Sequence, residues 1–464
     1  MKKYLFIFLF VVLSTSSFPQ YQFNGFDGQY PGVNQGQLAG GLGLNWIDDE
    51  LFYSFNFRPE VSFLNFGVGL DLKLDFNKEG KLRKQNFDEF SDYLSIIRYV
   101  RYGMKRDPVF IKLGALDYYT LGHGSIMYQY NNSPSFDSRK TGLVLDLDFG
   151  RFGFESIYSK FAEAGVIGLR GYVRPLQFTA LNMIPIISNI EVGASYATDL
   201  DPNVGVTYSI YDPTTKSFIN KRDKGAISII GLDLGLPLIS TSMLNVQLYT
   251  DYAKIVDYGS GISTGVMLEL NGLGILSAQA KLERRFNNGK YIPAYFNSFY
   301  EIERFRADSS MTTQMAGTDY PPNSITSKIQ RLESITETDN GYYGELGLNF
   351  AGLFFVLGSY QRLDKTPESG IMHLMAEVAP EGVPFVARAG YDKVNIKNEK
   401  DLVTLDDRSY LFAELGYKPM PYILVSMVYN WTYTPLRDKD DNVIGFKPQK
   451  RIEPRVSFIY PFKW

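Results

Sequence analysis

Apolar and polar side chains alternate with a period of two residues along most of the chain. In the run 66–76, one face carries apolar side chains, and the other carries glycine, aspartate and lysine. Comparable runs recur at 38–47, 51–63, 94–104, 108–117, 141–149, 151–161, 165–174, 188–199, 224–236, 244–252, 262–270, 276–283, 291–303, 341–350, 353–363, 371–379, 384–394, 408–418, 422–434 and 451–463. Because successive side chains of a β-strand point to opposite faces, this pattern predicts an all-β chain.

Short turns and long polar connections separate these runs. Asn271-Gly272 is a strong two-residue hairpin sequence, and Phe149-Gly150-Arg151 is a similarly short connection. The longer polar connections are 77–93, 131–138, 200–223, 304–339, 395–407 and 435–450. Short turns that alternate with long loops are typical of a barrel whose two ends differ.

Two segments depart from the strand pattern. Within 324–337, four apolar residues fall at helical spacing and predict a helix: Ile325, Ile329, Leu332 and Ile335. At the N-terminus, Lys2 and Lys3 precede an apolar run of ten residues, Tyr4 to Leu13. Ten residues are too few to span a bilayer as a helix, so residues 1–20 are interpreted as a cleaved signal peptide. Residues 21–464 then form one exported domain.

A soluble β-sandwich would also alternate, so other features must distinguish it from a transmembrane barrel. The alternating runs are long enough to cross a bilayer, which takes about 9–11 residues. Aromatic residues gather at strand ends, as in the girdles of membrane barrels: Trp46, Tyr53, Phe57, Phe66, Phe76, Phe149, Tyr429, Trp431 and Tyr433. We therefore predict a single transmembrane antiparallel β-barrel.

The last strand resembles the final strand of Gram-negative outer-membrane β-barrel proteins. In that class the strand alternates hydrophobic residues and ends on Phe or Trp, as do Phe458, Tyr460, Phe462 and Trp464 here. The resemblance implies a porin-like architecture, outer-membrane lipids as surroundings, and recognition of these four residues by the barrel-assembly machinery. Pro461 departs from the pattern because it removes a hydrogen-bond donor, which is tolerated near a strand end.

The strand number follows from the length of the mature chain. At roughly 40–48 residues per hairpin with its turn and loop, the chain supplies about 18–22 strands, with about 20 as the central value. Side chains alone do not fill so wide a barrel, so it holds water, inserted loops or a plug. The loop 304–339 is long enough to fold into the lumen or to lie at the surface. Strands begin near residue 38, which leaves no room for an N-terminal plug domain.

Composition restricts the chemistry. The 464 residues include no cysteine and two histidines, and the formal net charge is −3. The missing thiols exclude disulfides, thiolate metal sites and a cysteine nucleophile. Balanced charge provides no basic surface for nucleic acid.

Neither histidine completes a recognisable catalytic site. His123 and Ser125 would share a face of a strand, as in a membrane lipase, but no third group can be assigned, so a structural strand position is preferred. His373 is expected in the lumen or a loop. Asp438, Asp440 and Asn442 begin like a calcium loop, which then fails because Val443 and Gln449 occupy the glycine and glutamate positions. We predict no catalytic residue, no cofactor and no metal site.

The inward strand faces carry more acids than bases. The alternation places fifteen charged residues in the lumen: Asp71, Lys73, Asp75, Asp146, Asp148, Asp233, Asp251, Glu269, Lys281, Glu283, Glu345, Glu414, Lys418, Glu453 and Arg455. Eleven acids against four bases predict a negative lumen and mild cation selectivity. The alternative is that opposite charges pair across neighbouring strands.

The function expected of such a barrel is transport across the outer membrane of a Gram-negative bacterium. A porin-like channel for passive or substrate-selective passage of small solutes is the leading hypothesis. The alternative is a non-transport barrel that acts as a scaffold for adhesion or docking, or as the partner of a secretion system. An enzyme ranks third.

Overall fold

A computed structural model describes residues 34–463 of the chain with short gaps. The gaps are 48–49, 84–86, 88–92, 106, 117, 134–139, 162–164, 203–207, 213–216, 222–224, 242, 271–275, 308–324, 352, 379–382, 406–408 and 438–442. The signal-peptide prediction, Trp464 and the calcium-like residues Asp438, Asp440 and Asn442 lie outside the described residues.

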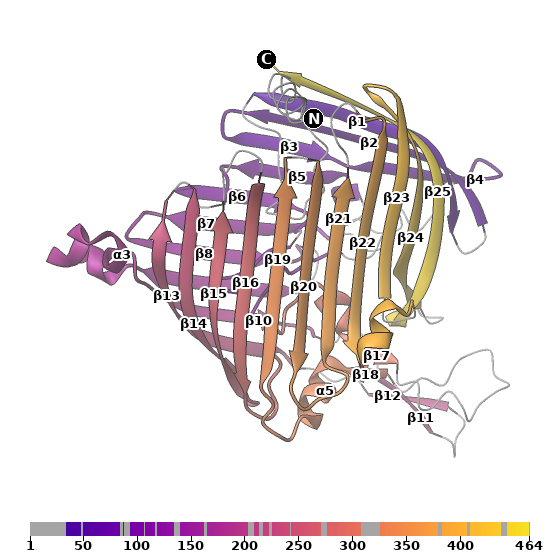
Figure 1. Ribbon diagram of the computed structural model, residues 1–464. Coiled ribbons are helices and arrows are strands. Elements are labelled where there is room, and N and C mark those ends of the chain that lie inside the picture. Colours follow the sequence, from indigo (N-terminus) through magenta and orange to yellow (C-terminus); the bar gives the residue numbers. More distant parts are fainter. Residues whose placement is uncertain are drawn as a thin grey trace, which may run out of the picture.

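The strands join into one antiparallel sheet that closes on itself (Figure 1). Their bounds are β1 Gln35–Ile47, β2 Glu50–Phe63, β3 Phe66–Leu70, β4 Leu72–Asn77, β5 Ile97–Tyr102, β6 Val109–Gly114, β7 Gly142–Asp148, β8 Phe152–Tyr158, β9 Val166–Val173, β10 Glu191–Asp199, β13 Ile227–Ser240, β14 Leu244–Ile255, β15 Ser260–Leu270, β16 Leu276–Asn287, β19 Gly341–Phe350, β20 Phe354–Leu363, β21 Gly370–Val378, β22 Phe385–Ile396, β23 Ser409–Met420, β24 Ile423–Arg437 and β25 Val443–Lys463. Since β3 and β4 both pair with β2 as one interrupted strand, the described sheet is a closed 20-strand barrel. The predicted all-β barrel is confirmed.

Short elements lie in the connections. They are η2 Pro175–Phe178, η3 Ala180–Met183, α3 Pro185–Ser188, β11 Tyr208–Asp212, β12 Ser217–Lys221, α4 Tyr300–Glu303, β17 Phe305–Ala307, β18 Ile325–Ser327, α5 Lys328–Ser334 and η5 Glu399–Val403. The helix predicted over 324–337 is confirmed as the shorter α5, because Ile325 instead begins β18, which pairs with β17. Within the described ranges, no helix is long and apolar enough to cross a membrane.

The two ends of the barrel differ as the turn pattern predicts. Strand pairing puts the first residue of β1 and the last residue of β25 at the same end of the barrel as the short turns 64–65, 149–151 and 421–422. We call this end the turn end. The connections 115–141, 200–226 and 288–340 lie at the opposite, loop end. The predicted loop 435–450 is wrong, because β24 and β25 continue their pairing through Pro435 and Phe446.

The outer wall is apolar. On β13, Ile230, Leu232 and Leu234 are exposed, and the alternate residues Ile229 and Asp233 are buried. Exposed aromatic rings form a belt near the turn end: Phe63, Phe66, Phe149, Phe152, Phe354, Phe385, Tyr417, Tyr422, Phe458 and Tyr460. A second group lies near the loop end: Tyr53, Tyr196, Tyr252, Phe286 and Tyr342. An apolar band between two aromatic belts suits a lipid bilayer.

The barrel closes between β1 and β25. The two strands pair antiparallel, with Gly36 opposite Phe462 and Gly40 opposite Phe458. A Cβ atom built on Gly36 would lie 2.5 Å from the ring of Phe462, so the aromatic rings lie directly over the glycines. Three of the four predicted assembly residues, Phe458, Tyr460 and Phe462, therefore belong to the closing strand. Their recognition by the assembly machinery stays a prediction.

Removing the rings over the seam glycines should weaken closure. The double variant Phe458→Ala/Phe462→Ala loses two cross-strand aromatic contacts, each worth about 0.2–1 kcal/mol. We expect less of the compact, unboiled species on a denaturing gel and a lower yield in the outer membrane. Phe63→Ala, which removes a belt ring away from the seam, is the control. Equal yields for the two variants and the wild type would contradict a special role of the seam.

Candidate functional site: two segments folded into the lumen

Two loop-end connections fold back into the barrel. The first lumen segment is residues 118–132, between β6 and β7, and the second lumen segment is residues 288–304, between β16 and β19. They pair with each other through a parallel bridge between Met127 and Phe296. The amide of Phe296 donates to the carbonyl of Ile126 at 3.1 Å. The two segments therefore form one unit inside the barrel.

A hydrophobic cluster holds this unit against one wall. The segments contribute buried Tyr119, Leu121, Ile126, Met127, Tyr130, Tyr291, Tyr295, Phe296 and Tyr300. The wall contributes inward residues near the loop end of β7 to β14: Val144, Ile157, Val166, Ala197, Ile227, Ile229, Ala253 and Ile255. Leu332 of α5 belongs to the same cluster, so part of the predicted loop 304–339 also packs on it. Burial of this many apolar side chains favours a fixed position for the unit.

The first lumen segment is not a strand, contrary to the sequence interpretation of His123. Gly122 and Gly124 adopt positive φ angles of 56° and 96°, which turn the chain. A Cβ atom on Gly122 would lie 2.9 Å from the Arg170 side chain, so this position also needs the absence of a side chain. The predicted strand 291–303 is wrong for a related reason, since it forms the second lumen segment and α4.

His123 fixes the first lumen segment to β14. Its Nδ1 lies 2.8 Å from Oδ1 of Asp251, and its Nε2 lies 3.0 Å from the Nε2 atom of Gln247. The ring stacks on Tyr249 with 4.6 Å between centroids. Lys281 on β16 donates to the carbonyl oxygen of His123 at 2.6 Å. Both ring nitrogens are thus engaged with the wall, an arrangement that anchors the segment.

The first lumen segment also contacts other strands around the lumen. The hydroxyl of Tyr119 donates to Asp146 on β7 at 2.9 Å. On another wall, Tyr128 and Gln129 donate to Glu345 on β19 at 2.6 Å and 2.9 Å. The segment therefore crosses the barrel interior and narrows it.

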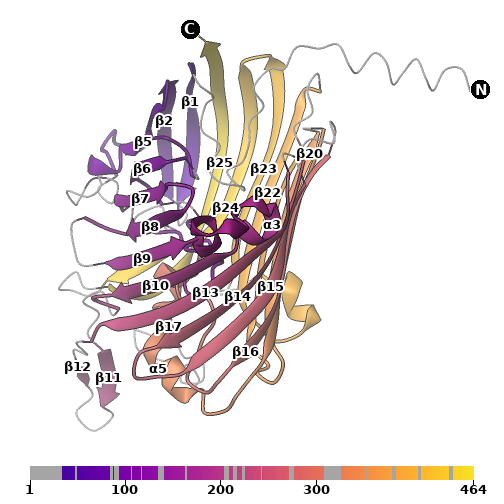
Figure 2. The ribbon, with the colours of Figure 1, turned by 90° about the vertical axis from the view of Figure 1, so that its left-hand side faces the viewer.

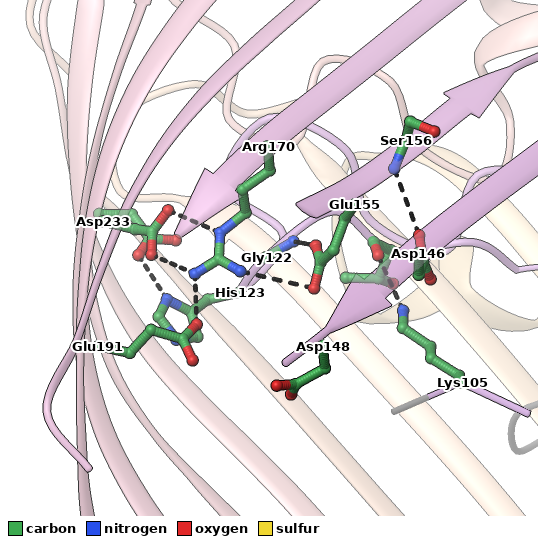
Figure 3. Close-up of polar contacts among 12 residues, drawn as sticks. Lys105, Gly122, His123, Asp146, Asp148, Glu155, Ser156, Arg170, Glu191 and Asp233 are labelled. Atoms are coloured by element: carbon green, nitrogen blue, oxygen red, sulfur yellow. Dashed lines mark hydrogen bonds and ion pairs between the residues drawn. The ribbon is translucent and has the colours of Figure 1, made fainter. Parts of the chain in front are cut away.

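Arg170 on β9 is the centre of a buried charge cluster beside this segment (Figure 3). Its guanidinium donates to both oxygens of Asp233, at 2.9 Å and 2.6 Å, and to Glu191 at 2.6 Å. It also lies 3.5 Å from Glu155, whose second oxygen accepts from the amide of Gly122 at 2.8 Å. One cation thus joins three carboxylates on β8, β10 and β13 and positions the turn at Gly122 (Figure 3).

Glu301 of α4 anchors the second lumen segment. It accepts hydrogen bonds from Tyr130 and Lys140 and forms an ion pair with Arg304 at 3.1 Å. Burial opposes ionisation, but Arg304 and Lys140 outweigh it and lower the pKa of Glu301 to about 2. Arg304 in turn pairs with Asp199 on β10 at 2.6 Å. Charge pairing therefore ties this segment both to the first lumen segment and to the wall.

None of the fifteen charged residues predicted to face the lumen is exposed, and Asp71 lies between β3 and β4 instead of within a strand. More of the acids among them form ion pairs than a count of eleven acids against four bases implies. Asp71 pairs with Arg58 at 2.9 Å, and Glu414 with Arg388 and Arg455 at 2.7 Å and 3.0 Å. The count omitted several buried bases, among them Arg101, Lys112, Arg170, Arg285 and Arg388. The same alternation applied to 94–104, 108–117, 165–174 and 384–394 would have found all of these except Arg285, which lies two residues past its run.

Inward arginine side chains differ in how much of their surface is exposed. The side chain of Arg58 is 48% exposed although it lies on the inward face of β2, whereas that of Arg170 is 2% exposed. Arg455 on β25 is 21% exposed. The lumen segments thus pack against β7 to β19. On the opposite side, Arg58 on β2 and Arg455 on β25 keep part of their surface exposed, although inward neighbours such as Asn56, Glu60 and Glu453 are buried. His373, on β21, is buried beside Asp392.

Among the described residues, no group of three or more His, Asp or Glu side chains could hold a metal ion.

Comparisons with known proteins give a likeness of architecture. No family model and no curated protein matches the chain. Among solved structures, Pseudomonas aeruginosa OccK11 (OpdR) is 10% identical, covering 92% of this chain and 95% of that one, with a TM-score of 0.31. The siderophore receptor PirA from Pseudomonas aeruginosa is 9% identical over 93% and 82%, with a TM-score of 0.38. The chain is similar to these outer-membrane barrels in being a closed β-barrel, and at such values neither structure informs its function.

Proposed function

We propose that the chain is an outer-membrane channel in which the two lumen segments narrow the path for small solutes. The observation that carries this proposal is the inward side chain of Arg58 on β2, which is 48% exposed and therefore contacts solvent inside the barrel. We place the path beside β2 and β25, where Arg58 and Arg455 retain exposed surface, on the side of the barrel opposite the apolar cluster. The apolar outer wall and its aromatic belts support insertion in a membrane.

Single-channel recording in planar bilayers tests this function. Purified chain should produce discrete conductance steps, since charged side chains along the path stabilise water and ions. Silence from chain that runs as a compact, unboiled species would support the alternative of a scaffold that displays its loops. A signal limited to boiled samples would show that the conductance comes from a contaminant.

Selectivity should be weak. The inward acids exceed the bases in the fifteen predicted positions, but pairing with Arg58, Arg388 and Arg455 reduces the net field. Screening over about 8–10 Å at physiological salt reduces it further. We expect a small cation preference that fades with rising salt, and a shift of the reversal potential toward anions when Asp71 and Asp75, on the side of the path, become Asn. Anion preference in the wild type would contradict this expectation.

A further inference from the structure

One connection at the turn end is long and apolar, unlike its neighbours. The rim segment, residues 174–190, joins β9 to β10 and contains η2, η3 and α3. Residues 175–190 include no charged side chain. Six of its large apolar side chains are exposed, by 37% to 87%: Phe178, Leu181, Met183, Ile184, Ile186 and Ile187.

The rim segment is folded in a way that turns its apolar side chains outward. Several of its polar side chains bond within the segment. Gln177 donates to Asn189 at 3.0 Å, and the Thr179 hydroxyl donates to the carbonyl of Leu176 at 2.9 Å and accepts from the amide of Leu181. With these polar groups satisfied internally, the exposed surface of the segment is mainly apolar, and Asn182 adds one exposed amide.

The rim segment is continuous with the outer wall. Arg151, in the turn between Phe149 and Phe152 of the turn-end belt, lies over the ring of Phe178 at 5.4 Å. α3 packs against β13, whose outward residues Leu234 and Ile239 are exposed. The segment projects sideways from the barrel wall (Figure 1), and Figure 2 shows it at the ends of β9, β10 and β13.

We infer that the rim segment is an in-plane membrane anchor that binds the lipid leaflet at the turn end. Its place beside the aromatic belt puts the apolar side chains at the boundary between headgroups and acyl chains, where amphipathic segments bury about 5–10 Å deep. Arg151 would then face the lipid phosphates beside Phe178. This inference rests on the proposed function in one respect, that the barrel lies in a membrane.

Because the chain has no cysteine, a thiol-reactive label modifies a single introduced cysteine and no other residue. A nitroxide label would be attached to Met183→Cys in chain reconstituted into phosphatidylethanolamine and phosphatidylglycerol vesicles. Leu232→Cys, on the exposed face of β13, is the lipid reference, and Glu79→Cys, at the loop end, is the aqueous reference. The rates at which each label collides with oxygen and with a water-soluble nickel chelate give its location. Oxygen concentrates in lipid, and the chelate stays in water.

The label at position 183 should favour oxygen over the chelate, as the label at 232 does. A ratio equal to that at 79 would overturn the anchor. Low access to both reagents with magnetic coupling between labels would also overturn it, because a second copy would then cover the segment. If the label at 232 is itself accessible to the chelate, the barrel is not in the bilayer, and the proposed function fails instead. Compact migration of unboiled samples confirms that each variant is folded.

Discussion

Replacing Arg170 with methionine is expected to cost the folded barrel about 3–5 kcal/mol, the range for breaking a buried ion pair by removing one partner. Asp233, Glu191 and Glu155 would lose the guanidinium that they share. Methionine fills a similar volume, so lost packing contributes little to the effect. The amide of Gly122 would also lose its orientation, because Arg170 positions its acceptor Glu155.

Arg174→Met is the matched control for this prediction. Arg174 lies at the same end of β9 and pairs with Asp148 at 3.1 Å and Glu191 at 3.0 Å, but its side chain is 19% exposed. Because this side chain is more exposed than that of Arg170 and shares fewer carboxylates, its loss should cost less than the loss of Arg170. The urea midpoint at which the compact, unboiled species disappears measures both variants. Equal midpoints for them would contradict the central role of Arg170.

Glu301→Gln is expected to release the second lumen segment. The substitution removes the negative charge between Lys140 and Arg304 and leaves two buried cations less well compensated. A local cost of about 3 kcal/mol raises the equilibrium constant for leaving the lumen roughly 100-fold. Single channels of the variant should spend more time in a high-conductance state. Glu333→Gln, at an exposed position of α5, is the control in the same loop and should behave as the wild type.

Acid should reproduce this release in the wild type. The pKa of Glu301 is lowered from its ordinary value of 4.5 to about 2, so the charged form stabilises the folded segment. That contribution is complete above about pH 4.5 and is lost as the pH falls toward 2. High-conductance openings should therefore become frequent over this interval and remain insensitive to pH in Glu301→Gln. Identical acid responses in both proteins would exclude Glu301 as the anchor.

The barrel could be predicted from sequence because one physical rule governs every strand. A wall with lipid outside and a lumen inside imposes a period of two, and that period is visible in runs such as 66–76 without any tertiary information. The same pattern also predicted that short turns and long loops lie at opposite ends of the barrel. The extension of β24 and β25 was missed, since Pro435 and the charged residues after it resemble a loop.

The lumen segments were harder to predict because their strand-like alternation has a different cause. Apolar and polar residues are interspersed in 118–132 and 291–303. The cause is that their apolar side chains pack on an internal cluster. One indication was present in the wall itself. On 224–236, Ile227 and Ile229 share the inward face with Asp233, and apolar residues facing a lumen need something apolar to cover them. Which segment supplies the cover depends on contacts that no local pattern records, such as that between Met127 and Phe296.

The central claim is that solutes cross the barrel beside the lumen segments, and thiol modification of single channels tests it most directly. Ser457→Cys places a thiol on the inward face of β25, on the side where Arg58 and Arg455 reach solvent. Ala253→Cys places one on the inward face of β14, under the apolar cluster. A charged methanethiosulfonate reagent should reduce the conductance of the first variant in discrete steps and leave the second unchanged. Block of the second variant, or no effect on the first, would contradict the claim.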